Sequence, residues 1–336
     1  MKEALFYKKL DNHTVQCLLC PHNCVIHDNK NGICGVRENK DGTLYTLVYG
    51  KAIAEHADPV EKKPLFNFFP GSRSFSISTV GCNFRCLHCQ NSDISQMPRD
   101  RGTISGTNRS PDDIVSIAKA TDCKSISYTY TEPTVYFEYA YETAKLASRN
   151  GLKNVFVTNG YINEEPLEKI KPYLDAANID LKAFSEDFYK KICGAKLQPV
   201  LDAIKAYKKR GIWIEITTLI IPNLNDSPDE LEQISRFIAK LGKEIPWHVT
   251  AFYPTYRLTD QPRTPVQTLM QAREIGLRAG LRYVYTGNVP GGEGENTYCY
   301  NCGHLLVQRL GFQIAENNIR NSSCPECNTR VDVVGM

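Results

Sequence analysis

The chain has 336 residues, 42% of them hydrophobic and 23% charged, and its 40 basic and 37 acidic residues leave a net charge of +3. This composition indicates a folded globular protein with one large core and appendages, or with two to three units. The small charge gives no support for nucleic-acid binding, and no apolar run reaches the length that a bilayer requires. The N-terminus has no signal-peptide core, so we expect a cytoplasmic protein without a membrane partner.

Three regions follow one another along the chain. Residues 1–70 form a loop-rich, cysteine-bearing region, with strands predicted at 43–50 and 51–57. Residues 71–288 alternate between strand-like and helix-like segments, which is the main indication of the fold. Residues 289–336 begin with a glycine-rich stretch and carry the last four cysteines. We therefore expect a cysteine-rich metal-binding region, a central α/β domain and a small C-terminal domain.

The central region contains six predicted strands, each followed by a predicted helix. Six such units indicate a parallel sheet with right-handed crossovers, and this sheet, when curled, is a partial (β/α)6 barrel of the TIM type. The strands are expected at 74–80, 124–130, 154–159, 177–183, 212–220 and 247–253, and the helices at 111–120, 134–150, 164–174, 198–210, 228–241 and 265–279.

In a barrel of this kind the functional groups lie at the carboxyl ends of the strands and in the loops that follow them. The first predicted strand leads into "GCNFRCLHCQN" (81–91), the second into "TEPT" (131–134), and the fourth ends in "DLK" (180–182). We expect these loops to converge on one mouth, with the cysteines of the first loop among them.

Thirteen cysteines in a cytoplasmic chain require an explanation, because thiols there are kept reduced. Clustered thiolates indicate metal binding, whereas an isolated cysteine such as Cys123 or Cys193 is most often a small core residue. Eleven of the thirteen fall in three clusters, namely Cys17, Cys20, Cys24 and Cys34, then Cys82, Cys86 and Cys89, and then Cys299, Cys302, Cys324 and Cys327.

The middle cluster has a C-x3-C-x2-C spacing, at Cys82, Cys86 and Cys89. A structural zinc site is closed by four protein ligands, so zinc would need His88 or a distant residue as the fourth. A 4Fe-4S cluster held by three cysteines leaves one iron open, and an open iron at a barrel mouth can bind a ligand. A cluster used only for electron transfer is the other alternative.

This spacing after the first strand of a partial barrel resembles the motif of the radical S-adenosylmethionine (radical SAM) enzymes. The resemblance implies that Cys82, Cys86 and Cys89 hold a 4Fe-4S cluster whose open iron chelates S-adenosylmethionine. It further implies reductive cleavage of S-adenosylmethionine to a 5′-deoxyadenosyl radical, which abstracts hydrogen from a substrate. The reductant is then expected to be a ferredoxin or a flavodoxin.

Two later motifs resemble cofactor-binding motifs of the same family. "YTEP" (130–133) resembles the "GGEP" motif, which makes Glu132 a contact of the methionine amino group, with Tyr130 and Thr131 in place of the glycines. "TNG" (158–160) resembles the motif near the ribose and the methionine, which nominates Asn159. Alternatively, Glu132 caps the following helix, and Asn159 with the next glycine is an ordinary turn pair.

Three further residues are nominated by likeness to the pyruvate formate-lyase activating enzymes. "DLK" places Asp180 at the ribose hydroxyls and Lys182 at the carboxylate, and the alternation of apolar residues around them indicates that both lie on one polar face of the strand. "IPWHV" places His248 beside the adenine, although a lone histidine there is as often a core residue. His88, before the third cysteine, is a second candidate to stack on the adenine.

The C-terminal cluster consists of two C-x2-C knuckles, "CYNC" and "CPEC", separated by a segment that can form a strand pair. Four thiolates in two knuckles predict a closed tetrahedral zinc-ribbon site at Cys299, Cys302, Cys324 and Cys327. A rubredoxin-like iron centre is the alternative.

The N-terminal cluster supplies four cysteines, Cys17, Cys20, Cys24 and Cys34, so the set can close without a histidine. Zinc is the first choice because the site is complete, and a second iron-sulfur cluster is its rival, since irregularly spaced thiolates also hold clusters. Spacing alone does not separate the two.

The flanking clusters, together with "YTYTEPTVYFEY", "PWHVTAFYPTY" and "YVYTGN", resemble the AmmeMemoRadiSam system radical SAM enzymes. This resemblance implies AMMECR1-type and Memo-type protein partners. Two alternatives stand beside it: an activase that installs a glycyl radical on a partner protein, and an iron-sulfur and zinc electron carrier or scaffold without catalysis.

Overall fold

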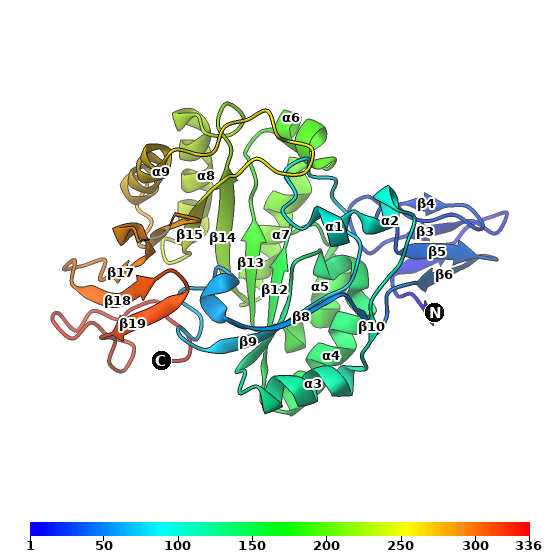
Figure 1. The fold of residues 1–336 in the computed structure, drawn as a ribbon, viewed down its shortest axis with the longest axis horizontal. Coiled ribbons are helices and arrows are strands. Elements are labelled where there is room, and N and C mark those ends of the chain that lie inside the picture. The colour runs from blue at the N-terminus through cyan, green and yellow to red at the C-terminus, as the bar shows by residue number, and fades with distance from the viewer. Residues whose placement is uncertain (290) are drawn as a thin grey trace.

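The computed structural model describes residues 1–289 and 291–336. Its centre is a sheet whose strands lie side by side in the order β16 (Val284–Gly287), β15 (Trp247–Ala251), β14 (Trp213–Ile220), β13 (Ala176–Asp180), β12 (Lys153–Thr158), β11 (Ser125–Tyr128), β9 (Arg73–Ser78) and β8 (Ala54–Pro59). All neighbouring pairs from β9 to β16 are parallel, and β8 pairs antiparallel with β9. The parallel part is the predicted α/β partial barrel (Figure 1).

The helices that connect these strands each bury one face, and two of them, which start at Pro111 and Pro228, are capped by the serine that precedes them. Ser110 and Asp113 form a reciprocal capping box at the start of the first connecting helix, and Pro111 occupies its first turn, where a missing amide hydrogen costs nothing. The connecting helices are α3 (Pro111–Ala120), α4 (Phe137–Arg149), α5 (Glu164–Ile170), α7 (Leu197–Lys209), α8 (Pro228–Leu241) and α9 (Val266–Arg278), and shorter ones are α1 (Ser92–Ser95), α2 (Met97–Asp100) and α6 (Glu186–Phe188).

All six predicted strand-helix units are present, and the structure adds two strands to their sheet. β16 is a seventh parallel strand of four residues, too short to show a periodicity of its own, and its pairing with β15 defines it. β8 overlaps the strand predicted at 51–57, but it pairs with β9 over its whole length. The boundary expected at residue 70 therefore lies between two strands of one sheet.

Two small antiparallel sheets precede the barrel and one follows it. The first two are formed by β1 (Lys2–Glu3), β6 (Thr43–Thr46) and β5 (Arg37–Lys40), and by β2 (Tyr7–Lys9), β3 (Val15–Cys17) and β4 (Val25–Ile26). The last consists of β17 (Thr297–Tyr298), β18 (Leu305–Leu310) and β19 (Gln313–Asn317), so the strand pair predicted between the two cysteine knuckles is confirmed. The N-terminal sheets and the C-terminal sheet lie on opposite sides of the barrel (Figure 1). The short strands β7 (Lys51–Ala52) and β10 (Thr107–Asn108) pair with each other.

The segment that links β8 to β9 closes the amino-terminal end of the barrel. Buried Glu215 of β14 accepts hydrogen bonds from the backbone amides of Phe66 (3.0 Å) and Asn67 (2.8 Å). Arg309 of β18, which is also buried, donates to the Phe66 carbonyl at 2.8 Å and lies over the Phe66 ring. These contacts attach the C-terminal sheet to the barrel and leave its carboxyl end for the cysteine loop.

Candidate functional site

The predicted loop with Cys82, Cys86 and Cys89 directly follows β9, at the carboxyl end of the sheet. Cys82 is buried, and its Sγ accepts hydrogen bonds from the Phe84 amide (3.4 Å) and from Asn159 Nδ2 (3.4 Å). Cys89 Sγ lies 3.1 Å from Ser95 Oγ. Burial raises the pKa of Cys82 and of Cys89, so a positively charged metal centre is what would hold these groups as thiolates.

The second cysteine of the loop, Cys86, has two close neighbours. Cys86 Sγ, a ring nitrogen of His88 and Cys193 Sγ all lie within 4.8 Å of one another. A hydrogen bond with Cys193, followed by burial, raises the pKa of Cys86. His88 is buried with no hydrogen-bond partner on Nδ1, and burial lowers the pKa of its ring to about 3, so the ring is neutral at physiological pH.

Cys193 was expected to be an isolated core residue, and it is fully buried, but the fold places it beside a predicted metal ligand. It ends a π-helical turn (Tyr189–Cys193) whose backbone supports the cysteine loop, since the Arg85 amide donates to the Cys193 carbonyl at 2.7 Å. No spacing in the sequence indicates this proximity, because more than 100 residues separate Cys86 from Cys193.

Glu132 joins the ends of two neighbouring strands. Its Oε1 accepts from the Thr134 amide (3.0 Å) and from Thr158 Oγ1 (2.8 Å), and its Oε2 accepts from the Asn159 amide (2.8 Å). The first of these bonds caps the short helix Pro133–Tyr136. Burial raises the pKa of Glu132. Because Asn159 in turn donates to Cys82 Sγ, this carboxylate positions a residue of the cysteine site.

Tyr130 and Thr131 fasten the loop after β11 to its neighbours. Tyr130 has a left-handed backbone (φ 63°), and its hydroxyl donates to Asp58 Oδ2 at 2.6 Å, toward β8. Its carbonyl accepts from Asn91 Nδ2, beyond the third cysteine, at 2.9 Å. Thr131 Oγ1 donates to the Thr79 carbonyl at 2.8 Å. The tyrosine side chain thus points to the sheet edge, whereas the backbone of this loop contacts the cysteine loop.

Asp180 and Lys182 lie on one face at the end of β13, as the alternation of their neighbours predicts. Lys182 Nζ is 2.8 Å from Asp180 Oδ2, and the two side chains are 13% and 32% exposed. Burial acts to lower the pKa of Lys182, but the charges of Asp180 and Cys86 outweigh it and raise the pKa well above its usual value. A permanent ammonium therefore lies next to the cysteine loop, where it can bind an anionic group.

His248 lies apart from the residues described so far. It is near the start of β15, and its Nε2 is 2.7 Å from Glu215, the carboxylate that holds the linker amides. Its ring is buried against Phe66 and Tyr285. The structure places His248 among the residues that close the amino-terminal end of the barrel, and it does not bring this histidine together with the cysteine loop.

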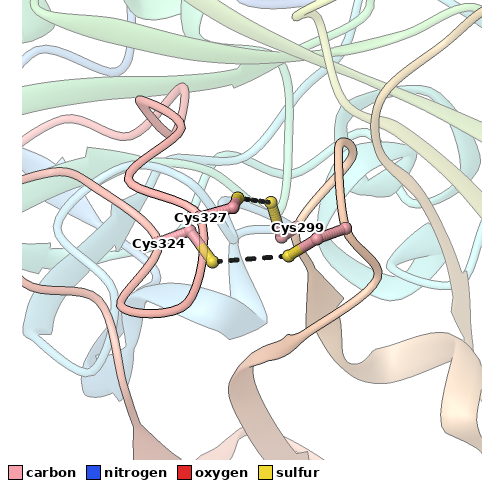
Figure 2. A group of neighbouring side chains, drawn as sticks. Cys299, Cys324 and Cys327 are labelled. Atoms are coloured by element: carbon pink, nitrogen blue, oxygen red, sulfur yellow. Dashed lines mark hydrogen bonds between the residues drawn. The ribbon is translucent and has the colours of Figure 1, made fainter.

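The four C-terminal cysteines converge on one point. Their sulfur atoms all lie within 4.8 Å of one another, with Cys299 facing Cys327 at 3.6 Å and Cys302 facing Cys324 at 3.7 Å (Figure 2). Four sulfurs around one zinc ion, with bonds of about 2.3 Å, would lie about 3.8 Å apart, so the spacing fits a single tetrahedral ion. Hydrogen bonds with Thr329 lower the pKa of Cys327 to about 5, which favours its thiolate.

The N-terminal cysteines face one cavity that lies against the barrel. Cys17, Cys20, Cys24 and Cys34 line one cavity, and its wall includes Asn83 and Thr134 from the two loops described above. Arg37 Nη1 donates to Cys17 Sγ at 3.6 Å, and the same guanidinium forms a buried ion pair with Glu138 of α4. Residues of the N-terminal region and of the barrel mouth therefore line this cavity together.

The fold and the cysteine loop define a partial-barrel protein with three thiols, at the carboxyl end of β9, that are suited to holding a metal centre. Comparison with known families identifies it further: residues 76–238, from within β9 into α8, match the radical SAM superfamily, so the chain contains a radical SAM domain. Members of this superfamily use a 4Fe-4S cluster, S-adenosylmethionine and a reductant. The chain is therefore an enzyme, which disfavours the non-catalytic scaffold.

Two relatives and one solved structure illustrate the likeness. The chain is 50% identical over 337 residues to an uncharacterized protein of Methanocaldococcus jannaschii, with 99% of this chain and 100% of the relative covered. It is 26% identical over 211 residues to a putative glycyl-radical enzyme activating enzyme of the same organism, covering 62% of this chain and 78% of the relative. The crystal structure of a radical SAM methyltransferase from Sphaerobacter thermophilus shares the fold, with a TM-score of 0.52 and 14% identity over 68% of this chain and 71% of that one.

Within residues 1–289 and 291–336, none of the helices combines the length and the apolar character needed to cross a bilayer.

Proposed function

We propose that this enzyme cleaves S-adenosylmethionine reductively to a 5′-deoxyadenosyl radical, which then abstracts hydrogen from a substrate. The observation that carries the proposal is the cysteine loop at the carboxyl end of β9, with two hydrogen-bond donors to Cys82 Sγ and the Lys182 ammonium beside the loop. A 4Fe-4S cluster, when bound by three cysteines, supplies one electron and an open iron for the sulfonium ligand.

The residues of the loop fit such a cluster. Cys82, Cys86 and Cys89 would each hold one iron, and the donors to Cys82 Sγ from Phe84 and Asn159 would stabilise its negative charge. The high pKa of the buried thiols means that they release their protons only when metal binds.

Lys182 and Asp180 are proposed to bind the zwitterionic nucleoside. The ammonium would meet the ligand carboxylate, and the partly exposed Asp180 would accept from the ribose hydroxyls. His88, neutral and buried behind Cys86, offers a ring that could stack on the adenine.

The other residues nominated as cofactor contacts would act through the backbone of the loops that follow β11 and β12. Glu132 would act mainly by holding Asn159, while Tyr130 and Thr131 would contribute backbone groups at the loop after β11. His248 would have to act from within its buried pair with Glu215, and it is the nominated residue whose contacts support a cofactor role least.

The C-terminal cysteines are proposed to bind structural zinc, which their spacing supports. The AMMECR1-type and Memo-type partners implied by the sequence resemblance belong to the same proposal, and pull-down with purified proteins of both types tests them.

A glycyl radical activase is the second candidate, favoured by the relative named as a putative activating enzyme. It shares the chemistry at S-adenosylmethionine but delivers the radical to a backbone glycine of a partner protein. Anaerobic incubation with glycyl radical proteins distinguishes the two, because an activase produces the characteristic electron paramagnetic resonance (EPR) doublet on the partner.

The proposal is tested by anaerobic reconstitution with iron and sulfide, followed by addition of S-adenosylmethionine and dithionite. We expect 5′-deoxyadenosine to form, and Cys86→Ala to abolish it while the fold persists. Cys123→Ala is the matched control, since Cys123 is buried just before β11, at the end of that strand opposite the cysteine loop. Unchanged product formation by Cys86→Ala would refute the ligand assignment, and its absence from the wild-type protein would refute the function.

A further inference from the structure

The N-terminal and C-terminal sets of four cysteines differ in the spacing of their sulfur atoms. All four C-terminal sulfurs lie within 4.8 Å of one another, whereas no three of the N-terminal sulfurs do. Two thiolates bound to one zinc ion, with bonds of about 2.3 Å, cannot be more than about 4.6 Å apart. The N-terminal thiols, as the fold arranges them, are too widely spaced for a shared single ion.

The same four thiols nevertheless face one enclosed space. They line a common cavity, whose wall also includes Leu19 and Ile26 and which is separated from the C-terminal site by the barrel. A polynuclear cluster suits this arrangement, because each cysteine binds a different iron and the sulfur atoms stand apart around the inorganic core.

We propose that Cys17, Cys20, Cys24 and Cys34 hold a second iron-sulfur cluster, and that this cluster passes electrons to the cysteine loop of the barrel. The first part stands on the spacing and the cavity. The second part rests on the proposed function, because it assigns the reductive step of that function a route through the N-terminal region.

The route is short because the two cysteine loops are packed together. The His22 ring, two residues after Cys20, lies 2.8 Å from the carbonyl of Asn83, the neighbour of Cys82. On the other side, a Cβ at Gly81 would lie 3.1 Å from the Cys34 carbonyl and 2.5 Å from Val36. Only glycine fits there, also because its φ is +99°, so the residue before Cys82 touches the residue that ends the N-terminal set.

A third contact crosses the same interface. Asn83 lines the N-terminal cavity, and its Oδ1 accepts from Asn159 Nδ2, which also donates to Cys82 Sγ. One residue pair thus lies between the two sets of thiolates.

The electron balance of this step is simple. A small one-electron carrier protein of ferredoxin or flavodoxin type reduces the N-terminal cluster by one electron. That cluster is then reoxidised as the barrel cluster gains the electron. No proton is transferred between the two sites, and no bond is formed or broken.

The first test isolates the N-terminal site by removing the other one. In the variant Cys82→Ala/Cys86→Ala/Cys89→Ala, anaerobic reconstitution should leave about four irons, about four sulfides and about one zinc per chain, with an EPR signal on reduction. Adding Cys20→Ala and Cys24→Ala should remove the iron and keep the zinc. Two zinc ions and no iron in the triple variant would overturn the cluster, and iron that persists in the quintuple variant would overturn its location.

The second test concerns the electron route. The ratio of 5′-deoxyadenosine formed with reduced flavodoxin to that formed with dithionite should fall at least tenfold in Cys20→Ala/Cys24→Ala, while the iron bound by the barrel loop remains. An unchanged ratio would overturn the relay. If the wild-type protein cleaves no S-adenosylmethionine, the proposed function and the relay fail together, whereas the metal counts of the triple variant still decide the cluster.

Discussion

The substitution Lys182→Ala tests the assignment of the nucleoside site. Lys182 is 13% exposed, its ammonium pairs with Asp180 at 2.8 Å, and its pKa is raised well above the usual value, so it offers a permanent charge in a partly dry site. A hydrogen bond to a charged group contributes about 1.5–3 kcal/mol. Because about 1.4 kcal/mol is a factor of ten, we expect the dissociation constant of S-adenosylmethionine to rise about 10- to 150-fold.

A second effect adds to the loss of this hydrogen bond, so the lower end of the range is a minimum. Without Lys182, the carboxylate of Asp180 loses its partner and repels the carboxylate of the ligand. The loss should affect binding more than cluster assembly, since Lys182 is not a cysteine ligand.

Equilibrium dialysis of S-adenosylmethionine against anaerobically reconstituted protein measures the constant, and iron and sulfide counts on the same samples measure the cluster. Lys191→Ala is the matched control, because Lys191 is 73% exposed and pairs with Asp187 one helical turn away. A dissociation constant within about twofold of the wild-type value, at equal iron content, would remove Lys182 from the site.

Three further predictions concern stability and metal content. Glu138→Ala leaves the buried Arg37 charge unpaired and should cost about 3–5 kcal/mol, which lowers the melting temperature by about 4–7 °C if the chain unfolds as one unit; calorimetry checks this, and an unchanged melting temperature contradicts it. Cys302→Ala should release about one zinc per chain and expose the C-terminal region to proteases, so full zinc content and unchanged proteolysis would disprove the site. Burial acts to raise the pKa of Asp58, but the hydrogen bond from Lys63 outweighs it and the pKa is depressed. Stability from Asp58 is therefore present above its unfolded pKa of about 3.9 and lost as pH falls below it, and acid unfolding monitored by circular dichroism should show this loss in the wild type and not in Asp58→Asn.

Local patterns were sufficient for the regular part of the fold. Each of the six predicted strands carries a run of buried residues, and each helix has an apolar stripe, so period and length identify them without any partner. The same holds for the shared face of Asp180 and Lys182, because neighbours on a strand alternate between its two sides. β16 and the sheet membership of β8 could not be found this way, since pairing with β15 and β9 defines them.

The candidate site also has a part that local patterns predict and a part that they do not. The cysteine spacing and the order of the motifs predicted the loop, the C-terminal knuckles and the polar residues after the strands. These patterns did not predict where His248 lies. Glu215, one strand away, holds it at the amino-terminal end of the barrel. Cys193 was missed because its nearness to Cys86 depends on how a π-helical turn packs against the loop.

What the sequence determined by itself was therefore which residues can bind metal, on which strand ends they lie, and which superfamily they indicate, because these properties depend on residue type and on distances along the chain. Only the tertiary structure decided how far apart the sulfur atoms lie and which loops they face. Both sets supply four cysteines, enough to close a metal site, yet one is spaced for a single ion and the other surrounds a cavity at the barrel mouth. The physical reason is that a thiolate's partners are set by the packing of segments distant in the chain, which no local spacing records.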